Sequence, residues 1–272
     1  MAQQKPFILP KDIPLDEYPK PEVFLEEGKR LTEEATKRGL HLRVMGPLAL
    51  HYYFPEQIEL YAKLERLGER YFTDIDYAAY GKERKKMMDF FAEMGYECDL
   101  QTMMMSGKTR HIYYGGAVPM IDVFYDKLNY CHEVSYEGRL DLDPWSVSLA
   151  DILLQKLQIV EINHKDLTDI EYLFTVAEIG EDDEKKINAA YIAKRFADDW
   201  GFWYTATQLN LPKVKTHCDE AKALSPEQRE RIKAQTDKML ARIEAEPKTK
   251  AWEKRAKKGP GKIWYNEGFS DW

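Results

Sequence analysis

The Thr-Asp-Ile-Asp-Tyr stretch at residues 73–77 decides how this chain is interpreted. Residues two apart on a β-strand share a face, so Asp74 and Asp76 point the same way while their apolar neighbours point into a core. Two carboxylates held side by side repel each other unless a cation or a proton lies between them. The stretch therefore predicts a strand that holds a hard divalent ion, although an Asp-x-Asp strand is also common without a metal.

A third acid, Asp122, has the same setting, because its neighbours at 120–124 are all apolar. If the strands of Asp76 and Asp122 are adjacent, three carboxylates converge. That arrangement serves two-metal phosphoryl or nucleotidyl transfer, in which the ions activate the attacking oxygen and hold the transferring phosphorus. Gly46, between an expected strand and a helix, marks a turn where backbone N–H groups meet phosphate. A simple turn glycine is the alternative interpretation of Gly46.

The hydrophobic pattern predicts an α/β half to about residue 140 and a helical half after Pro144. Helices are expected at 22–38, 55–68 and 82–94, and strands at 41–45, 72–80, 97–104, 109–114, 119–125 and 129–136. Ser225 opens a capping box for a helix that runs to about Ala245. The expected parts are an extended proline-rich arm at 1–21, an α/β domain at 22–140, a helical domain at 141–246 and a basic aromatic tail at 247–272.

Composition excludes several classes of protein. The 272 residues are 44% apolar, and the three cysteines include no Cys-x-x-Cys pair, which argues against a disulfide framework and favours a reducing cytoplasm. No apolar run approaches the ~20 residues that a membrane span requires. The net charge is −7, with the tail basic and the body acidic, so non-specific nucleic-acid binding by the body is not expected. The tail's lysines, arginines and tryptophans either bind single-stranded RNA or form a packed helix end.

The order of these motifs resembles the polymerase-beta-type nucleotidyltransferase superfamily. The resemblance rests on Val44-Met45-Gly46, Asp74-Ile75-Asp76 and Ile121-Asp122-Val123. The stretch at 149–158 followed by 165–169 is similar to the toxin-type branch linked to bacterial abortive-infection systems. Within that branch the chain resembles uncharacterised bacterial proteins of nucleotidyltransferase-like type, over nearly its whole length.

This resemblance implies an α+β fold, with a mixed β-sheet flanked by helices and followed by a helical C-terminal domain. It implies that Asp74, Asp76 and Asp122 bind Mg²⁺, or Mn²⁺ in its place, and that Asp122 helps to deprotonate the acceptor. Gly46 would lie under the triphosphate of an NTP such as ATP. Two features depart from the pattern: proline follows Gly46 where serine or glycine is usual, and 28 residues separate Gly46 from Asp74.

Further residues are candidates for contact with the nucleotide. Pro47 lacks an N–H, so the next donor of that turn is Leu48. The other nucleotide candidates are Arg70, Thr73, Lys156 and Lys165. Asp166 and Asp169 are supporting candidates, one helical turn apart, with Asn163 able to cap their helix. The alternative for Lys156 is a helix lysine with a solvated head, and structural roles are the alternative for Asp166 and Asp169.

The sequence thus favours Mg²⁺-dependent transfer of a nucleotide to RNA (for example a tRNA end), to a protein side chain or to a small molecule. A second interpretation is a nucleotide-binding or interaction protein of the same fold that has lost catalysis through the Gly46-Pro47 turn. A third is a metal-dependent phosphohydrolase, which needs only water as the acceptor. The oligomeric state is not predicted.

Overall fold

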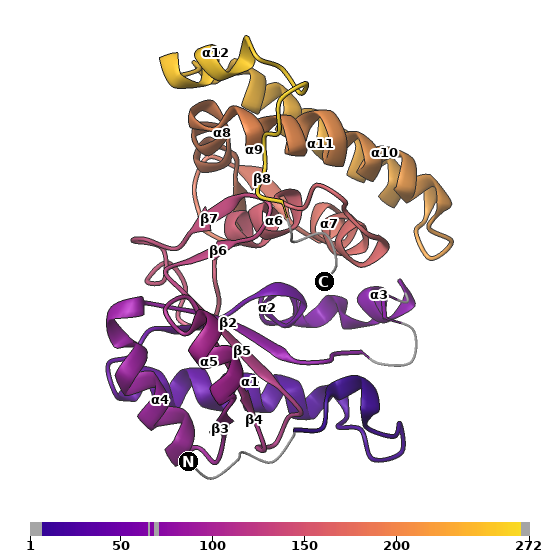
Figure 1. The fold of residues 1–272 in the computed structure, drawn as a ribbon. Helices are drawn as coiled ribbons and strands as arrows, with labels where there is room; N and C mark the ends of the chain where they lie inside the picture. The colour runs from indigo at the N-terminus through magenta and orange to yellow at the C-terminus, as the bar shows by residue number, and fades with distance from the viewer. Residues whose placement is uncertain (1–6, 65, 68–70, 268–272) are drawn as a thin grey trace. The chain divides into compact units, whose positions relative to one another are not determined.

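The computed structural model describes residues 7–64, 66–67 and 71–267. The chain divides into two compact units, coloured by residue number in Figure 1. Unit 1 comprises Met1–Tyr53, Leu67–Leu128 and Ser135–Val147, and unit 2 comprises Phe54–Arg66, Asn129–Val134 and Ser148–Trp272. No helix in the described ranges is long and apolar enough to cross a membrane.

Unit 1 is built on one mixed sheet. Its strands are β1 (Leu42–Val44), β2 (Ile75–Ala79), β3 (Glu97–Cys98), β4 (Arg110–Tyr114) and β5 (Ile121–Tyr125), in the order β1-β2-β5-β4-β3. The pair β2 and β5 is parallel, and the other neighbours are antiparallel. Its helical segments are η1 (Pro10–Asp12), α1 (Pro21–Lys37), α2 (Gly46–Tyr53), η3 (Gly81–Glu83), α4 (Arg84–Glu93) and α5 (Leu100–Ser106).

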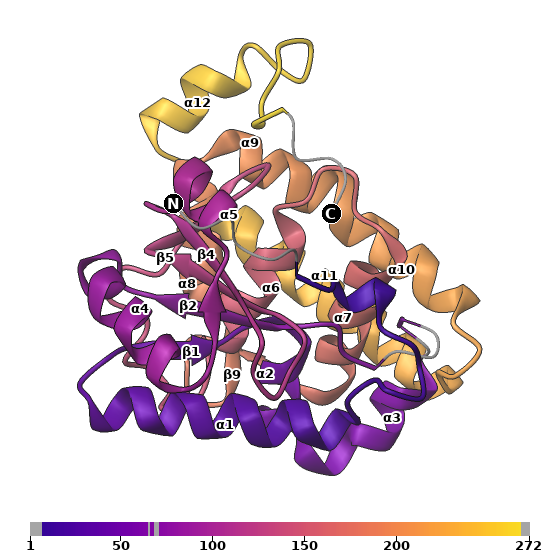
Figure 2. The ribbon, with the colours of Figure 1, turned by 60° about the horizontal axis from the view of Figure 1, so that its bottom comes forward.

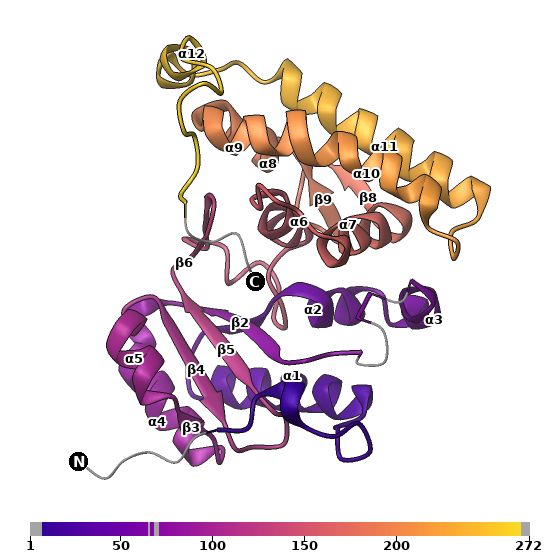
Figure 3. The same cartoon turned by 45° about the vertical axis from the view of Figure 1, so that its right-hand side comes forward.

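Helices α1 and α4 lie against one face of this sheet (Figures 2 and 3), and aromatic side chains pack between them and the strands. The Tyr77 hydroxyl donates to the Gly28 carbonyl of α1 at 3.1 Å, and the Phe91 ring of α4 stacks on Tyr113 at 4.2 Å. A Cβ on Gly28 would come within 2.5 Å of the Tyr52 hydroxyl, so glycine lets α1 approach α2 closely. Because side chains alternate along a strand, Asp76 lies on the opposite face from Tyr77.

Unit 2 is mainly helical. Its helical segments are η2 (Pro55–Gln57), α3 (Ile58–Lys63), α6 (Leu149–Leu157), α7 (His164–Val176), α8 (Ala189–Asp198), α9 (Trp200–Tyr204), the π-helix η4 (Thr205–Asn210), α10 (Leu211–Glu220), α11 (Pro226–Ala245) and α12 (Lys250–Ala256). A parallel pair of short strands, β8 (Glu178–Gly180) and β9 (Lys186–Asn188), lies among them. The chain also forms a two-stranded sheet from β6 (Lys127–Asn129) and β7 (Glu133–Ser135).

The C-terminal tryptophans are used for packing within unit 2. The Trp252 ring meets Trp203 edge to face at 5.0 Å, and the Arg255 guanidinium lies over Trp200 at 4.4 Å. The Trp264 indole N–H donates to the Thr205 hydroxyl at 3.0 Å. These contacts match the packed helix end that the sequence allowed for the tail.

The expected architecture is confirmed: a mixed sheet flanked by helices is followed by a mainly helical part. The strand expected at 97–104 is wrong, because β3 has two residues and α5 follows it. The Asp99 side chain accepts from the Gln101 N–H at 2.9 Å and from the Thr102 hydroxyl at 2.7 Å, which caps a helix. A wholly helical C-terminal half is also wrong, since β8 and β9 interrupt it.

The start of α11 was predicted correctly, whereas the end of the helix expected over 55–68 was not. The Ser225 capping box is confirmed, with the Gln228 N–H donating to the serine hydroxyl and the Gln228 side chain accepting from the Ser225 N–H. The helix expected over 55–68 is shorter: η2 and α3 cover its first part, and α3 ends at Lys63.

Candidate functional site

Asp76 and Asp122 are direct neighbours across the parallel pair of β2 and β5. This confirms the expected adjacency of their strands. Apolar residues surround both acids along the chain, and burial of those residues orients the two carboxylates toward the same face of the sheet. Asp122 is 3% exposed, whereas Asp76 is half-buried.

Asp74 lies directly before β2 and is half-buried. The Thr73 hydroxyl donates to its Oδ1 at 2.9 Å, so Thr73 orients the Asp74 carboxylate. The negative charge of Asp74 also contributes to raising the pKa of Asp122. The N-terminal segment supports this part of the chain, because the Tyr18 hydroxyl donates to the Phe72 carbonyl at 3.1 Å.

Gly46 begins α2 against the Asp76 carboxylate. Its φ is +60°, a conformation that favours glycine, and a Cβ on it would lie 3.7 Å from Asp76 Oδ2. The Met45 N–H donates to the Asp76 carbonyl at 2.8 Å, which fixes the turn beside β2. Leu48 is buried in the first turn of α2. The turn at Gly46 therefore lies beside the Asp76 carboxylate.

Arg110 neutralises Asp122. Its Nε lies 2.9 Å from each carboxylate oxygen, and its terminal nitrogen also donates to Oδ2. Burial raises the pKa of Asp122 to about 6, against the opposing effect of Arg110. Within the described ranges no group of three or more His, Cys, Asp or Glu side chains is arranged to hold a metal ion. In this structure the positive charge next to Asp122 is therefore the Arg110 guanidinium.

We expect Arg110→Met to lower the free energy of unfolding by about 2–3 kcal/mol, because it leaves a buried carboxylate without its partner. The expected loss is below that of a fully buried pair, since 19% of the Arg110 side chain is exposed. Urea denaturation at neutral pH measures the change. The double variant Arg110→Met with Asp122→Asn should recover most of the loss, and an equal loss in both variants would contradict the pairing.

Three candidates from the second half of the sequence form a separate cluster within unit 2: Lys156, Asp166 and Asp169. Lys156 Nζ lies 2.9 Å from Asp166 Oδ1 and 2.8 Å from Asp169 Oδ2. Asp169 Oδ1 also contacts Arg66 Nε at 2.7 Å and accepts from the Tyr61 hydroxyl at 2.8 Å. These contacts join α3, α6 and α7, which favours a structural role for the cluster.

The other candidates occupy simpler positions. The Asn163 side chain accepts from the Asp166 N–H at 3.2 Å and so caps α7 as expected. Lys165, in the first turn of α7, is half-buried and takes part in no ion pair with another described residue. Arg70 lies outside the described residues.

The sequence analysis did not identify Arg110 as the partner of Asp122. No local pattern marks it, because its neighbours along the chain are the polar residues Thr109 and His111. In the register of β4 and β5, Ile112 faces Asp122 and Arg110 faces Phe124, so the arginine reaches the acid diagonally.

The fold and these residues define an α+β protein with acids on adjacent strands of a mixed sheet. No protein-family model matches the chain, and no curated protein matches it either. Among solved structures it is similar to the antibiotic-resistance factor ANT(2'')-Ia, with 15% identity over 82% of this chain and 95% of that chain. The TM-score is 0.29, so this likeness carries no argument about function, which is inferred from the geometry of the site alone.

Proposed function

We propose that this protein transfers a nucleotide from a nucleoside triphosphate, such as ATP, to an acceptor in a Mg²⁺-dependent reaction. The observation that carries the proposal is the pairing of Asp76 with Asp122 on parallel strands, with the Gly46 turn against Asp76. A phosphate-binding turn beside two acids is what metal-dependent nucleotide transfer requires.

The donor chemistry of the acids fits a hard divalent ion, because Mg²⁺ and Mn²⁺ both prefer carboxylate oxygens. Asp74, Asp76 and Asp122 would hold the ion, which would take the place that the Arg110 guanidinium has beside Asp122. When bound, the ion would polarise the transferring phosphoryl group and lower the pKa of the acceptor hydroxyl.

The chain's own groups have separate tasks in this proposal. The N–H groups in the first turn of α2, that of Leu48 among them, would bind the triphosphate. Thr73 orients Asp74 through its hydrogen bond. Asp122, the neighbour of Asp76 across β2 and β5, would help to deprotonate the acceptor. The acceptor itself, whether RNA, protein or a small molecule, is left to experiment.

A second candidate is a nucleotide-binding protein of this fold that does not catalyse transfer. The ion pair between Arg110 and Asp122 favours it, because that pair occupies the acid that catalysis needs. Pro47 favours it too, since it removes one N–H from the first turn of α2.

Incubation of the full chain with each α-³²P-labelled NTP, Mg²⁺ and a cell extract tests the proposal. Label that remains in the RNA, protein or small-molecule fraction identifies both nucleotide and acceptor. Label released only as free nucleotide or phosphate indicates hydrolysis. Binding of an NTP with no labelled product favours the second candidate.

Pro47→Ser should bind an NTP about tenfold more tightly, because one added charge-assisted hydrogen bond is worth at least about 1.5 kcal/mol. The Pro47 carbonyl accepts from His51 Nδ1 at 2.8 Å, and a serine keeps that carbonyl. Calorimetry with Mg²⁺ present measures the affinity. Pro21→Ser, at the first turn of α1, is the matched control. Unchanged or weaker binding in Pro47→Ser would mean that the turn does not face the triphosphate.

A further inference from the structure

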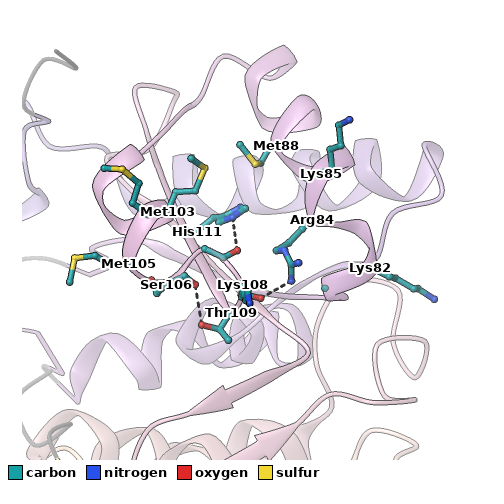
Figure 4. Close-up of a pocket in the computed structure, with 13 residues that line it drawn as sticks. Lys82, Arg84, Lys85, Met88, Met103, Met105, Ser106, Lys108, Thr109 and His111 are labelled. Atoms are coloured by element: carbon teal, nitrogen blue, oxygen red, sulfur yellow. Dashed lines mark hydrogen bonds between the residues drawn. The ribbon is translucent and has the colours of Figure 1, made fainter. Parts of the chain in front are cut away.

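A pocket of about 770 Å³ lies in unit 1, away from the carboxylates. It is bounded by η3 and the start of α4, by α5, and by the loop that leads into β4 (Figure 4). His111 forms part of its lining, and the Tyr125 hydroxyl lies 3.0 Å from His111 Nδ1. Tyr125 is three residues from Asp122 on β5, so this lining belongs to the opposite face of the sheet.

Four cations line this pocket, and its lining includes no aspartate or glutamate. They are Lys82, Arg84, Lys85 and Lys108. Arg84 donates to the Lys108 carbonyl at 2.7 Å, which ties the loop to the helix (Figure 4). Within the described ranges none of the three lysines forms an ion pair. This is an unusual concentration of positive charge on a chain whose net charge is −7.

Two acids, Glu83 and Asp126, lie near these cations. The Glu83 carboxylate accepts from the His41 N–H at 2.8 Å and contacts His41 Nδ1 at 2.8 Å. Asp126 accepts from the Gly81 N–H at 2.8 Å, and its other carboxylate oxygen lies near the Arg84 guanidinium, so it offsets part of that charge. Burial lowers the pKa of His111, and its Nε2 lies 3.0 Å from the Gly107 carbonyl oxygen. The charge of the pocket therefore comes from the four cations.

The opposite wall is formed by methionines. Met103, Met104 and Met105 come from α5, with Met104 78% and Met105 82% exposed, whereas Met88 lies on α4 with Arg84 and Lys85. Figure 4 shows Met103 and Met105 on one side of the pocket and Arg84 and Lys85 on the other. Methionine side chains are flexible and polarisable, and they adapt to the faces of rings. The pocket thus offers a cationic wall and an apolar wall to one ligand.

From this arrangement we propose that the pocket binds a small organic polyphosphate, with its phosphates on the lysines and its ring against the methionines. The volume lies in the range of small-molecule sites, and four cations exceed what a single carboxylate would need. Because no acid lines the pocket, phosphate binds there without a divalent ion. This inference does not depend on the proposed function, which uses the carboxylates on the other face.

Calorimetry with ATP in excess EDTA tests the site on the full chain. The wild type should bind ATP without a divalent ion. Lys85→Ala and Lys108→Ala should each weaken binding about threefold to tenfold, since exposed charge contacts are modest, and the double variant should weaken it more. Lys86→Ala is the matched control, because Lys86 is exposed on the same helix but outside the pocket lining. Asp76→Asn should leave this binding unchanged.

The apolar wall has its own test. Met104→Ser with Met105→Ser should weaken ATP binding and leave inorganic tripolyphosphate binding unchanged. The proposal is overturned by absence of ATP binding in EDTA, or by equal losses in Lys86→Ala and Lys85→Ala. It is also overturned if a short single-stranded RNA binds far more tightly than ATP and loses that binding in the same lysine variants, since the occupant is then a nucleic-acid strand. Thermal melting confirms that each variant is folded.

Discussion

Asp76→Asn is expected to reduce nucleotide transfer about a thousandfold, because a carboxylate that binds the catalytic ion contributes several kcal/mol to the transition state. Asparagine keeps the size of the side chain and removes its charge. Asp76 faces Asp122 across β2 and β5 and lies beside the Gly46 turn, so the change affects the centre of the candidate site. The rate of label incorporation from the preferred NTP measures the effect.

Asp89→Asn provides the matched control for that experiment. Asp89 is exposed on α4, so its loss should leave the transfer rate within a factor of about two. Melting temperatures show whether both variants are folded. Transfer by Asp76→Asn at the wild-type rate would remove the carboxylates from the mechanism, whatever the fold.

The acids were predictable from the sequence because their signal is local. Each lies among apolar residues on a strand, and that pattern determines which face the acid occupies. The pairing of β2 with β5 then follows from two buried strands that need partners. Gly46 was also a local signal, since the chain needs a left-handed residue to turn from β1 into α2.

The partner of Asp122 was not predictable in the same way. Arg110 reaches that acid through the register of β4 against β5, and a shift of one residue would have placed the arginine on the other face. The contacts of Lys156 depend in turn on how α3, α6 and α7 pack, and not on any one segment. Charge partners set by tertiary packing leave no periodic pattern in the sequence.

The methionine-rich segment was misassigned for a different reason. Residues 100–106 include Leu100, Gln101 and three methionines, and these residue types favour helices over strands. Asp99 gave the start signal through its own side chain, but the flanking strands suggested a continuous sheet. The same misassignment hid the basic pocket, because α5 supplies its apolar wall.

The cluster around Asp169 gives the largest expected effect on stability. Asp169→Ala should lower the free energy of unfolding by about 3–5 kcal/mol, because Arg66 loses its carboxylate and Lys156 keeps only Asp166. Asp169 is 1% exposed, so water cannot replace the lost partner. Urea denaturation at pH 7 measures the loss. Lys165→Ala, a change on the same helix, should stay within about 0.5 kcal/mol.

The pH dependence of the free energy of unfolding shows whether Asp169→Ala destabilises the protein by removing a charge or by leaving a cavity. Burial alone would raise the pKa of Asp169, but the charges of Arg66 and Lys156 hold it below the usual value of 3.8. A carboxyl group with a lowered pKa in the folded state stabilises the protein above its unfolded pKa, and the contribution disappears as the pH falls through the folded pKa. The wild type should therefore lose stability below about pH 4 more steeply than Asp169→Ala does. Parallel curves for the two proteins would show that the variant loses packing and not an ion pair.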